Sequence, residues 1–359
     1  MITNTDVRTF DVIEITNEMP FNRIGGVGSV IENLLSGFQT LDIQALWFLV
    51  DHSYRPFELE KILADYPSVV IGKHEDLRRF QSPIVHLHSY NYNPQLLAYL
   101  SDKKSIFTIH SLLVYEEDSN DVELPQAVQW QETLIAACEE IVLISEAERQ
   151  YYHKLGYHGL NSNVSVIHNG VKPPTRFCNQ RQNRVLGFCG RLVPRKHPEY
   201  VQMILREKGF EDYTTMIAGK AFSTYARDLL QDLEIEDRVR YLGWCGGARL
   251  EAFYDNIDVL AVPSTYEPFG MAALEATARG IPIVCTRVDG LAEILGEYAF
   301  YCQGDTYADF RTAMYRWLAA GEETIAALTS GARMRYRRHF TDVIMARKYQ
   351  RRFANLVEQ

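Results

Sequence analysis

Residues 259–280 of the chain read VLAVPSTYEPFGMAALEATARG. The apolar run Val259–Val262 predicts a buried strand. Pro268 and Gly270 then turn the chain sharply, and the helix that follows ends at Gly280. A buried strand that turns directly into a helix is the repeating unit of a doubly wound α/β fold, so this stretch predicts that fold.

The same alternation extends through the chain in both directions. Apolar runs bounded by polar or turn residues predict further strands at residues 11–15, 45–50, 68–71, 84–87, 105–109, 140–144, 185–189, 214–217, 239–242 and 281–285. Residues 172–184 are polar, contain two prolines and have the composition of a linker. We therefore predict two doubly wound domains, 1–175 and 176–337, and a C-terminal helix at about 338–359 that packs back onto the first.

Composition narrows the class of protein. The chain has 359 residues, of which 47% are hydrophobic and 23% charged, as in two ordinary globular domains. Its formal net charge of −9 argues against nucleic-acid binding. The sequence contains neither a signal peptide pattern nor an apolar run long enough to span a membrane. Because the six cysteines form no C-x-x-C pair, we expect reduced thiols in a cytoplasmic protein.

Two carboxylates flank the start of the predicted helix in the opening stretch. Glu267 lies in the loop, and Glu275 follows eight positions later on the helix. The unpaired backbone N–H groups near Phe269, Gly270 and Met271 favour an anion. A nucleotide sugar would suit this arrangement, because it has hydroxyl groups at both ends and a diphosphate between them.

A basic loop follows the first strand of the second domain. Residues 190–197 read GRLVPRKH and carry three cations at the carboxyl end of a strand, where open α/β sheets bind ligands. Arg191 and Lys196 could neutralise a diphosphate, Arg191 through two parallel hydrogen bonds from its guanidinium group and Lys196 through its compact positive charge. A solvated basic loop is the alternative interpretation.

The first predicted strand is followed by a glycine loop, GGVGSV at residues 25–30, which opens a helix. Such a loop lets the backbone approach a ligand closely. Ile31 occupies the third glycine position of the dinucleotide fingerprint, so the fingerprint is not met and a dehydrogenase is disfavoured. A tight strand-to-helix turn explains the loop equally well.

Three histidines, His86, His88 and His110, fall at predicted strand ends in the first domain. Each is either a structural histidine or a ligand-binding one. The spacing of His86 and His88 could suit a metal, but the sequence places no acidic partner nearby, and we predict no metal.

Two further segments of the first domain could contact an acceptor. Tyr90 and Tyr92, with amides between and after them, offer the aromatic faces that a sugar-like acceptor would need, although a surface turn is equally compatible. The acidic run at residues 116–121 reads as a solvated loop, with a cationic acceptor as the alternative.

Together these segments resemble the retaining GT-B glycosyltransferases of family 4 (GT4), with looser similarity to glycogen and starch synthases. Glu267 through Glu275 matches the E-x7-E motif of that family. Arg191 and Lys196 match its paired phosphate-binding cations, and residues 25–28 match its glycine loop. His110 matches the histidine of its first domain. His197 and Asp289 depart from it, because glycine is common at both positions.

The resemblance implies two Rossmann-like domains that face each other across an interdomain cleft. It implies that Glu275 holds ribose hydroxyls, Glu267 holds sugar hydroxyls, and Arg191 and Lys196 stabilise the leaving diphosphate without metal. It places His110 beside the donor sugar. The remaining donor contacts that it implies are Gly26, Gly28, Gly243, Trp244, Phe269, Gly270 and Met271, and the acceptor side would include His88, Tyr90 and Tyr92.

We therefore expect a metal-independent transferase that moves one sugar from a UDP-sugar, or next a GDP-sugar, to a hydroxyl of a small molecule, glycan or glycolipid. A nucleotide-sugar epimerase, a glucosyltransferase like glycogen or starch synthase, and a non-catalytic sugar-nucleotide-binding protein are the alternatives. A monomer and a homodimer are both compatible with the sequence, and contact with a membrane surface stays open.

Overall fold

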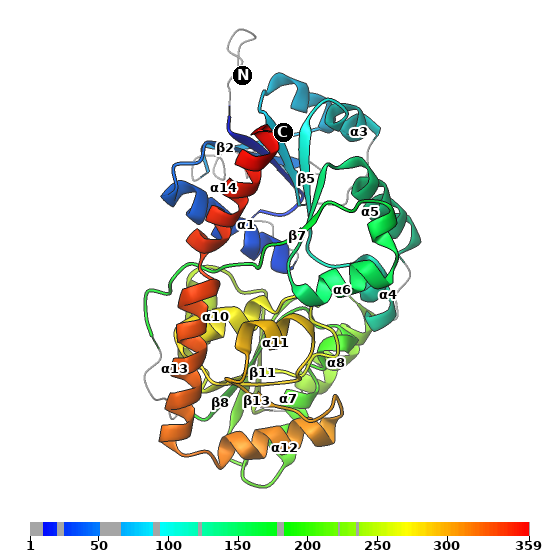
Figure 1. Cartoon of the computed structure of the whole chain (residues 1–359). Helices are drawn as coiled ribbons and strands as arrows, with labels where there is room; N and C mark the ends of the chain where they lie inside the picture. Colours follow the sequence, from blue (N-terminus) through cyan, green and yellow to red (C-terminus); the bar gives the residue numbers. More distant parts are fainter. Residues whose placement is uncertain are drawn as a thin grey trace. The chain divides into compact units, whose positions relative to one another are not determined.

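The computed structural model describes residues 10–19, 25–50, 66–88, 94–120, 124–177, 183–221, 223–234 and 237–358. The chain divides into two compact units (Figure 1). Unit 1 comprises Met1–Val114, Glu123–Gly170 and Asp342–Gln359. Unit 2 comprises Tyr115–Val122 and Val171–Thr341.

Unit 1 is built on a seven-stranded sheet in the order β3-β2-β1-β4-β5-β6-β7, in which every pair is parallel. Its strands are β1 Val12–Thr16, β2 Ala45–Val50, β3 Val69–Gly72, β4 Ile84–Leu87, β5 Lys104–Ile109, β6 Glu140–Leu143 and β7 Val164–Val166. Its helices are α1 Gly26–Thr40, η1 His74–Arg79, α3 Pro94–Leu100, α5 Pro125–Ala137, α6 Glu146–Lys154, η2 Tyr157–Gly159 and α14 Asp342–Glu358, and α4 Leu113–Asn120 continues from it into unit 2.

Unit 2 repeats the architecture with six parallel strands in the order β10-β9-β8-β11-β12-β13. Its strands are β8 Val185–Cys189, β9 Thr214–Ala218, β10 Val239–Gly243, β11 Val259–Val262, β12 Ile283–Cys285 and β13 Phe300–Tyr301. Its helices are η3 Pro194–Lys196, α7 Tyr200–Met203, η4 Ile204–Arg206, α8 Thr224–Glu234, α9 Ala248–Asn256, α10 Met271–Arg279, α11 Asp289–Leu295, α12 Tyr307–Leu318 and α13 Glu322–His339.

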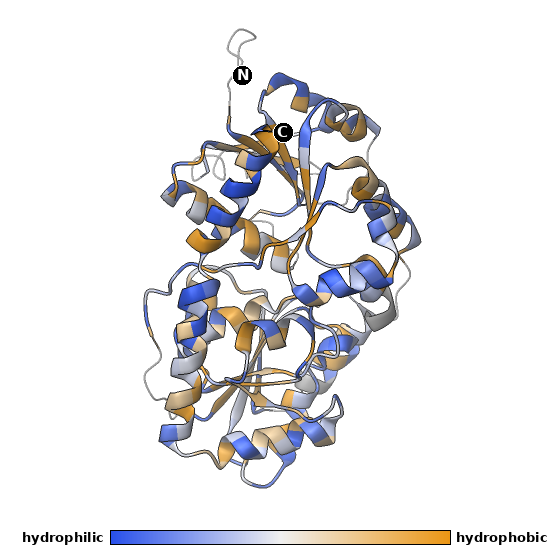
Figure 2. Ribbon diagram, viewed as in Figure 1, coloured by the Kyte–Doolittle hydropathy of each residue, from blue (hydrophilic) through white to orange (hydrophobic). Residues whose placement is uncertain are grey.

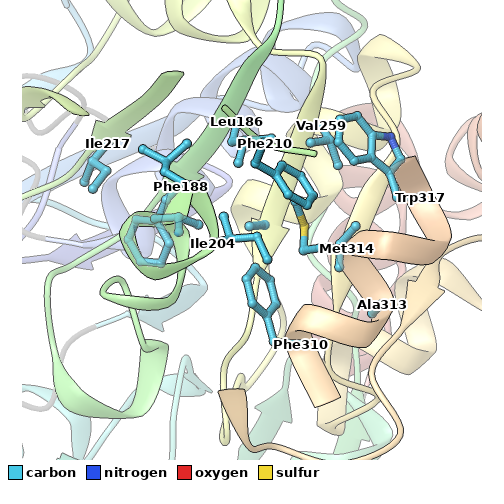
Figure 3. Close-up of a cluster of buried hydrophobic side chains, with 14 of the residues drawn as sticks. Leu186, Phe188, Ile204, Phe210, Ile217, Val259, Phe310, Ala313, Met314 and Trp317 are labelled. Atoms are coloured by element: carbon cyan, nitrogen blue, oxygen red, sulfur yellow. The ribbon is translucent and has the colours of Figure 1, made fainter. Parts of the chain in front are cut away.

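Apolar strands form the centre of each unit, and the helices that flank them alternate between hydrophobic and hydrophilic residues (Figure 2). In unit 2, one face of the sheet packs against α12 through the cluster drawn in Figure 3. Phe188 and Val259 come from neighbouring strands, and Phe310 and Met314 come from α12, where they stand four residues apart on one face. None of the helices that the structure describes is long and apolar enough to cross a bilayer.

The predicted doubly wound fold is confirmed, and every predicted strand is present with its ends shifted by at most two residues. Sequence analysis did not identify β7 or the two-residue β13, because such short edge strands carry little hydrophobic pattern. In each sheet the strand order reverses once, between β1 and β4 in unit 1 and between β8 and β11 in unit 2. Open α/β sheets bind ligands beside the carboxyl ends of the strands at such a reversal.

The last helix, α14, packs on α1 within unit 1. A Cβ atom at Gly37 of α1 would lie 2.6 Å from Cβ of Ala346 and 2.7 Å from the carbonyl oxygen of Asp342. The Ser36 hydroxyl lies 2.7 Å from the Asp342 carboxylate at the start of the same contact. The two helices therefore approach so closely that only glycine fits at position 37.

We expect Gly37→Val to loosen α14 from unit 1 and to cost about 1–3 kcal/mol, because the added atoms overlap the backbone of the partner helix. Hydrogen exchange of α14 amides measures the change. Gly159→Ala is the control, because a Cβ there meets nothing within 4 Å among the described residues. Equal exchange of α14 in both variants would contradict the close approach.

Candidate active site

The reversal in unit 2 brings two loops together. The loop after β8 contains the basic residues, and the loop after β11 contains Glu267. The backbone N–H of Thr265 donates to the carbonyl oxygen of Arg195 at 2.8 Å, which fixes one loop on the other. The predicted cations and the predicted carboxylate therefore meet at the edge of the sheet where ligands bind.

The turn into α10 uses the glycines that the sequence marks. Gly270 has φ 99° and Gly280, after the helix, has φ 75°, which are left-handed conformations that suit glycine. The helix begins at Met271, two residues later than the expected start near Phe269. Phe269 is 2% exposed and its ring packs against Phe340 with 6.2 Å between centroids, so only its backbone is placed to contact a ligand.

Asp289 completes this turn, a role that sequence analysis did not assign. Its carboxylate accepts a hydrogen bond of 3.0 Å from the backbone N–H of Glu267. A Cβ at the next residue, Gly290, would lie 2.4 Å from Cα of Phe269, so the second residue of α11 must be glycine at that contact. The start of α11 therefore fixes the backbone of Glu267.

Glu267 and Lys196 form a buried ion pair. The Lys196 Nζ atom lies 2.5 Å from Oε2 of Glu267, and the Ser264 hydroxyl donates to the same oxygen at 3.2 Å. Burial alone would raise the pKa of Glu267, but the charges of Lys196 and Arg195 outweigh it and lower that pKa. Burial lowers the pKa of Lys196 despite the nearby carboxylate. Each charge is stabilised by the other in a site largely shielded from water.

Glu116 pairs with the two arginines, which corrects the expectation of a solvated acidic run at its first residue. It is 7% exposed and accepts hydrogen bonds from Arg191 at 3.1 Å and from Arg195 at 3.0 Å. Arg195 itself is 3% exposed and also donates to the carbonyl oxygen of Tyr266. Arg195 is therefore held by two elements of unit 2, whereas the Arg191 side chain is 35% exposed.

Glu275 lies on the first turn and a half of α10, about 6 Å along the axis from Met271. The hydroxyl of buried Tyr254 donates to its Oε2 atom at 2.8 Å. At the end of β10, Gly243 has φ 65° and accepts a hydrogen bond from Gly219, and Trp244 is 39% exposed. Of the predicted contacts, Gly243 ends β10, Trp244 follows it, and Glu275 lies within α10, all in unit 2.

In unit 1, the glycine loop binds a carboxylate of the chain itself. The backbone N–H groups of Gly25 and Gly28 each donate to Oε2 of Glu18 at 3.1 Å. Gly26 begins α1, so this carboxylate sits at a helix N-terminus, where negative charge is favoured.

The three histidines also lie in unit 1, and the expectation that they lack an acidic partner is wrong. Glu14 on β1 is 0% exposed and lies within hydrogen-bond distance of both His86 and His88. His88 in turn contacts His110. The sequence does not reveal this contact, because Glu14 lies within an apolar strand and is 72 residues from His86.

Glu14, His86 and His88 present one oxygen and two nitrogens within 4.8 Å of one another, which is a donor set that transition metals accept. The two N···O separations are 2.9 Å and 2.7 Å. Neighbouring ligands of a tetrahedral zinc lie roughly 3.3 Å apart when the bonds are about 2.0 Å long. The group therefore has the geometry of direct hydrogen bonds.

The predicted site residues thus divide between the units. Arg191, Lys196, Glu267, Glu275 and the residues around them belong to unit 2, and Gly26, Gly28, His88 and His110 belong to unit 1. Tyr90 and Tyr92 lie outside the described residues. Glu116, Arg195, Asp289, Glu14 and Glu18 are additions that the structure makes.

Two family models match the chain in sequence. A match to the family described as Glycosyltransferase Family 4 covers residues 24–173, and a match to Glycosyl transferases group 1 covers residues 176–334. HepE of Anabaena, solved with UDP and glucose, is 16% identical and superposes with a TM-score of 0.75 over 96% of this chain and 99% of its own. At that identity the likeness shows the fold alone.

Two curated relatives match in sequence. An uncharacterised glycosyltransferase of Methanocaldococcus jannaschii is 26% identical over 59% of this chain and 59% of its own length. A D-inositol 3-phosphate glycosyltransferase of Saccharomonospora viridis is 29% identical over 60% of this chain and 56% of its own. The matched region therefore spans less than two thirds of either relative.

We expect unit 1 to lose stability between pH 7 and pH 5. Burial lowers the pKa of His86 and His88 to about 3, whereas an unfolded histidine titrates near 6.5. Burial lowers the pKa of His110 to about 3 as well. Below pH 6.5 the unfolded state binds more protons than the folded state, so the free energy of unfolding decreases as the pH is lowered. Burial raises the pKa of Glu14, which acts in the opposite sense, but it is one group against three.

Hydrogen exchange of amides in β4 and β5, corrected for intrinsic rates, measures this change. The opening free energy should fall by more than about 1 kcal/mol between pH 7 and pH 5. Amides of β8 and β11 in unit 2 are the internal reference. If the opening free energy of β4 and β5 fell no more than that of the reference strands, these histidines would not be held neutral.

Proposed function

Because the chain belongs to glycosyltransferase family 4, we propose that it transfers a single sugar from a nucleoside-diphosphate sugar to a hydroxyl group of an acceptor. The observation that carries the proposal is the buried Lys196–Glu267 pair at the carboxyl ends of β8 and β11, with Arg191 and Glu275 in the same unit. These groups match the two kinds of chemistry in such a donor, a diphosphate and hydroxyl-bearing rings.

The ion pair defines how the donor would bind. A diphosphate that reaches Lys196 supplies the negative charge that Glu267 provides in the free protein. Glu267 is then available to accept hydrogen bonds from hydroxyls of the donor sugar, and Glu275 from hydroxyls of the ribose. We propose that the exposed face of Trp244 borders the base and that the first N–H groups of α10, after Gly270, face the phosphates.

The reaction that we propose retains the anomeric configuration and needs no metal. The bond between the anomeric carbon and the β-phosphate oxygen breaks, and the acceptor oxygen bonds to the same face. The acceptor proton passes to the departing phosphate oxygen. Arg191 and Lys196 stabilise the charge that develops on the diphosphate, which is the role that a metal ion would otherwise have.

The donor that we favour is a UDP-sugar, followed by a GDP-sugar. HepE, which shares the fold, was solved with UDP and glucose, and this supports a UDP-sugar. The acceptor is a hydroxyl of a small molecule, glycan or glycolipid. The five described cysteines are all free, which supports a reducing, cytoplasmic location.

We expect Lys196→Ala and Glu267→Ala each to lower the transfer or hydrolysis rate on the order of 10³-fold, because each removes a charge that meets the donor in the transition state. Rates are measured with the preferred donor at saturating concentration. Lys208→Ala and Glu297→Ala, at exposed positions of the same unit, are matched controls. Near-normal turnover in both site variants would refute the roles given to this pair.

The donor is identified by thermal shift and slow hydrolysis with UDP-, GDP- and ADP-sugars. A retaining transferase should release the nucleoside diphosphate and a sugar that initially has the donor's anomeric configuration. NMR of the donor incubated alone distinguishes the epimerase alternative, because an epimerase changes the sugar without releasing it. Binding without any turnover would favour a non-catalytic protein.

A further inference from the structure

A chain of buried hydrogen bonds in unit 1 ends at His110. Nε2 of His110 lies 3.1 Å from Nδ1 of His88, and Nε2 of His88 lies 2.7 Å from Oε2 of Glu14. The same oxygen lies 2.9 Å from Nδ1 of His86. Glu14, His86 and His88 are respectively 0%, 0% and 3% exposed, so water does not compete for these bonds.

The other arm of the chain is also closed. Nε2 of His86 lies 2.7 Å from the Thr108 hydroxyl, which lies 2.9 Å from the hydroxyl of Tyr349 on α14. Tyr349 and Thr108 are each 1% exposed. Thr108 therefore has both a donor and an acceptor neighbour, and it can donate to His86 while it accepts from Tyr349.

The charge state of Glu14 decides the proton positions in this chain of hydrogen bonds. Burial raises the pKa of Glu14, whereas its contacts with His88 lower it. In its ionised form the carboxylate only accepts hydrogen bonds, so an ionised Glu14 requires that His86 carry its proton on Nδ1 and His88 on Nε2. Nδ1 of His88 is then a lone pair, and the bond to it requires a proton on Nε2 of His110. Nδ1 of His110 is thereby left as a lone pair. This atom is buried and has no hydrogen-bond partner among the residues that the structure describes.

We propose that Glu14 acts through His88 as a positioning residue, which holds His110 in its Nε2–H tautomer and keeps Nδ1 as a hydrogen-bond acceptor for a hydroxyl of the donor sugar. This inference rests on the proposed function and adds to it a contact between His110 and the donor sugar, which the family resemblance implies. A hydroxyl that donates to a nitrogen lone pair becomes richer in electrons. It therefore stabilises the positive charge of an oxocarbenium-like transition state better than a hydroxyl that accepts a hydrogen bond.

The opposite arrangement of protons also gives an unbroken chain of hydrogen bonds. The charge of Glu14 therefore decides which of the two arrangements forms. If the side chain at position 14 donated to Nε2 of His88, then His88 would donate from Nδ1 to His110, and His110 would carry its proton on Nδ1. Both orders use the same atoms and the same distances. The charge of Glu14 is thus transmitted over two imidazole rings as a choice of tautomer.

Glu14→Gln tests the proposal with almost no change in shape. The amide nitrogen should take the Oε2 position, because two imidazole nitrogens lie 2.7 Å and 2.9 Å from that atom. A buried amide N–H without a partner is also more costly than a bare carbonyl. We therefore expect His88 and His110 to change to their Nδ1–H tautomers. Two-bond proton–nitrogen spectra of the full chain labelled with ¹⁵N-histidine report each tautomer, with His110 assigned from His110→Asn.

The kinetic expectation for Glu14→Gln is a fall in kcat of about 10- to 100-fold, with a smaller change in KM, using the donor identified above. His88→Phe keeps a ring and removes the link between Glu14 and His110. In that background Glu14→Gln should change kcat by less than about twofold, because the pathway is already broken. Glu140→Gln is the matched control, because Glu140 is also 0% exposed and bonds only Ser165 and Arg352 among the contacts described.

The outcomes separate the two proposals. An Nδ1–H tautomer of His110 in the unmodified protein, or the same His110 tautomer before and after Glu14→Gln, would overturn the inference. So would a stoichiometric metal that is lost in Glu14→Gln. If the tautomers change as expected but no nucleoside-diphosphate sugar is turned over, the control of His110 by Glu14 stands and the proposed function fails.

Discussion

The ion pair between Lys196 and Glu267 is the interaction on which the site in unit 2 depends. Neither charge could be buried alone, because an isolated ion in such a place costs several kcal/mol of lost solvation. The pair therefore fixes the loop after β8 to the loop after β11, and the backbone bond from Thr265 to Arg195 closes the same contact. A ligand that replaces one partner has to supply the same charge, and this selects for an anion beside Lys196.

Carboxylates of the chain itself stand at the other anion-attracting groups as well. Glu116 meets Arg191 and Arg195 in unit 2, and Glu18 meets the N–H groups of Gly25 and Gly28 at the start of α1 in unit 1. In each case a carboxylate of the chain pairs with the cations or the helix N-terminus, so the surrounding backbone is ordered before any ligand binds. A phosphate that bound at either place would have to displace that carboxylate from the same hydrogen-bond donors.

The sequence predicts the local part of this structure well and its long-range part poorly. Val259 to Gly280 specifies a strand, a turn and a helix through periodicity and glycine positions, all within one short segment. Glu14 and His86 are 72 residues apart, and Glu116 and Arg195 are 79 apart, so their pairing exists only once the parallel strands have aligned. No spacing in the sequence encodes those contacts. Hence the sequence indicates the motif residues but does not indicate the carboxylates with which they pair.

The two departures from the family pattern show how such contacts substitute for glycine. His197 and Asp289 have φ values of 44° and 41°, in the left-handed region that glycine adopts without strain. Each side chain makes a bond that offsets part of that strain, His197 through Nδ1 with Glu199 at 2.9 Å and Asp289 with the N–H of Glu267 at 3.0 Å. The backbone path that glycine would give is therefore kept, and a side-chain hydrogen bond now stabilises it. Because neither residue adds a cation or removes a carboxylate from the Lys196–Glu267 pair, the departures change how the loops are held and leave the charges of the pair unchanged.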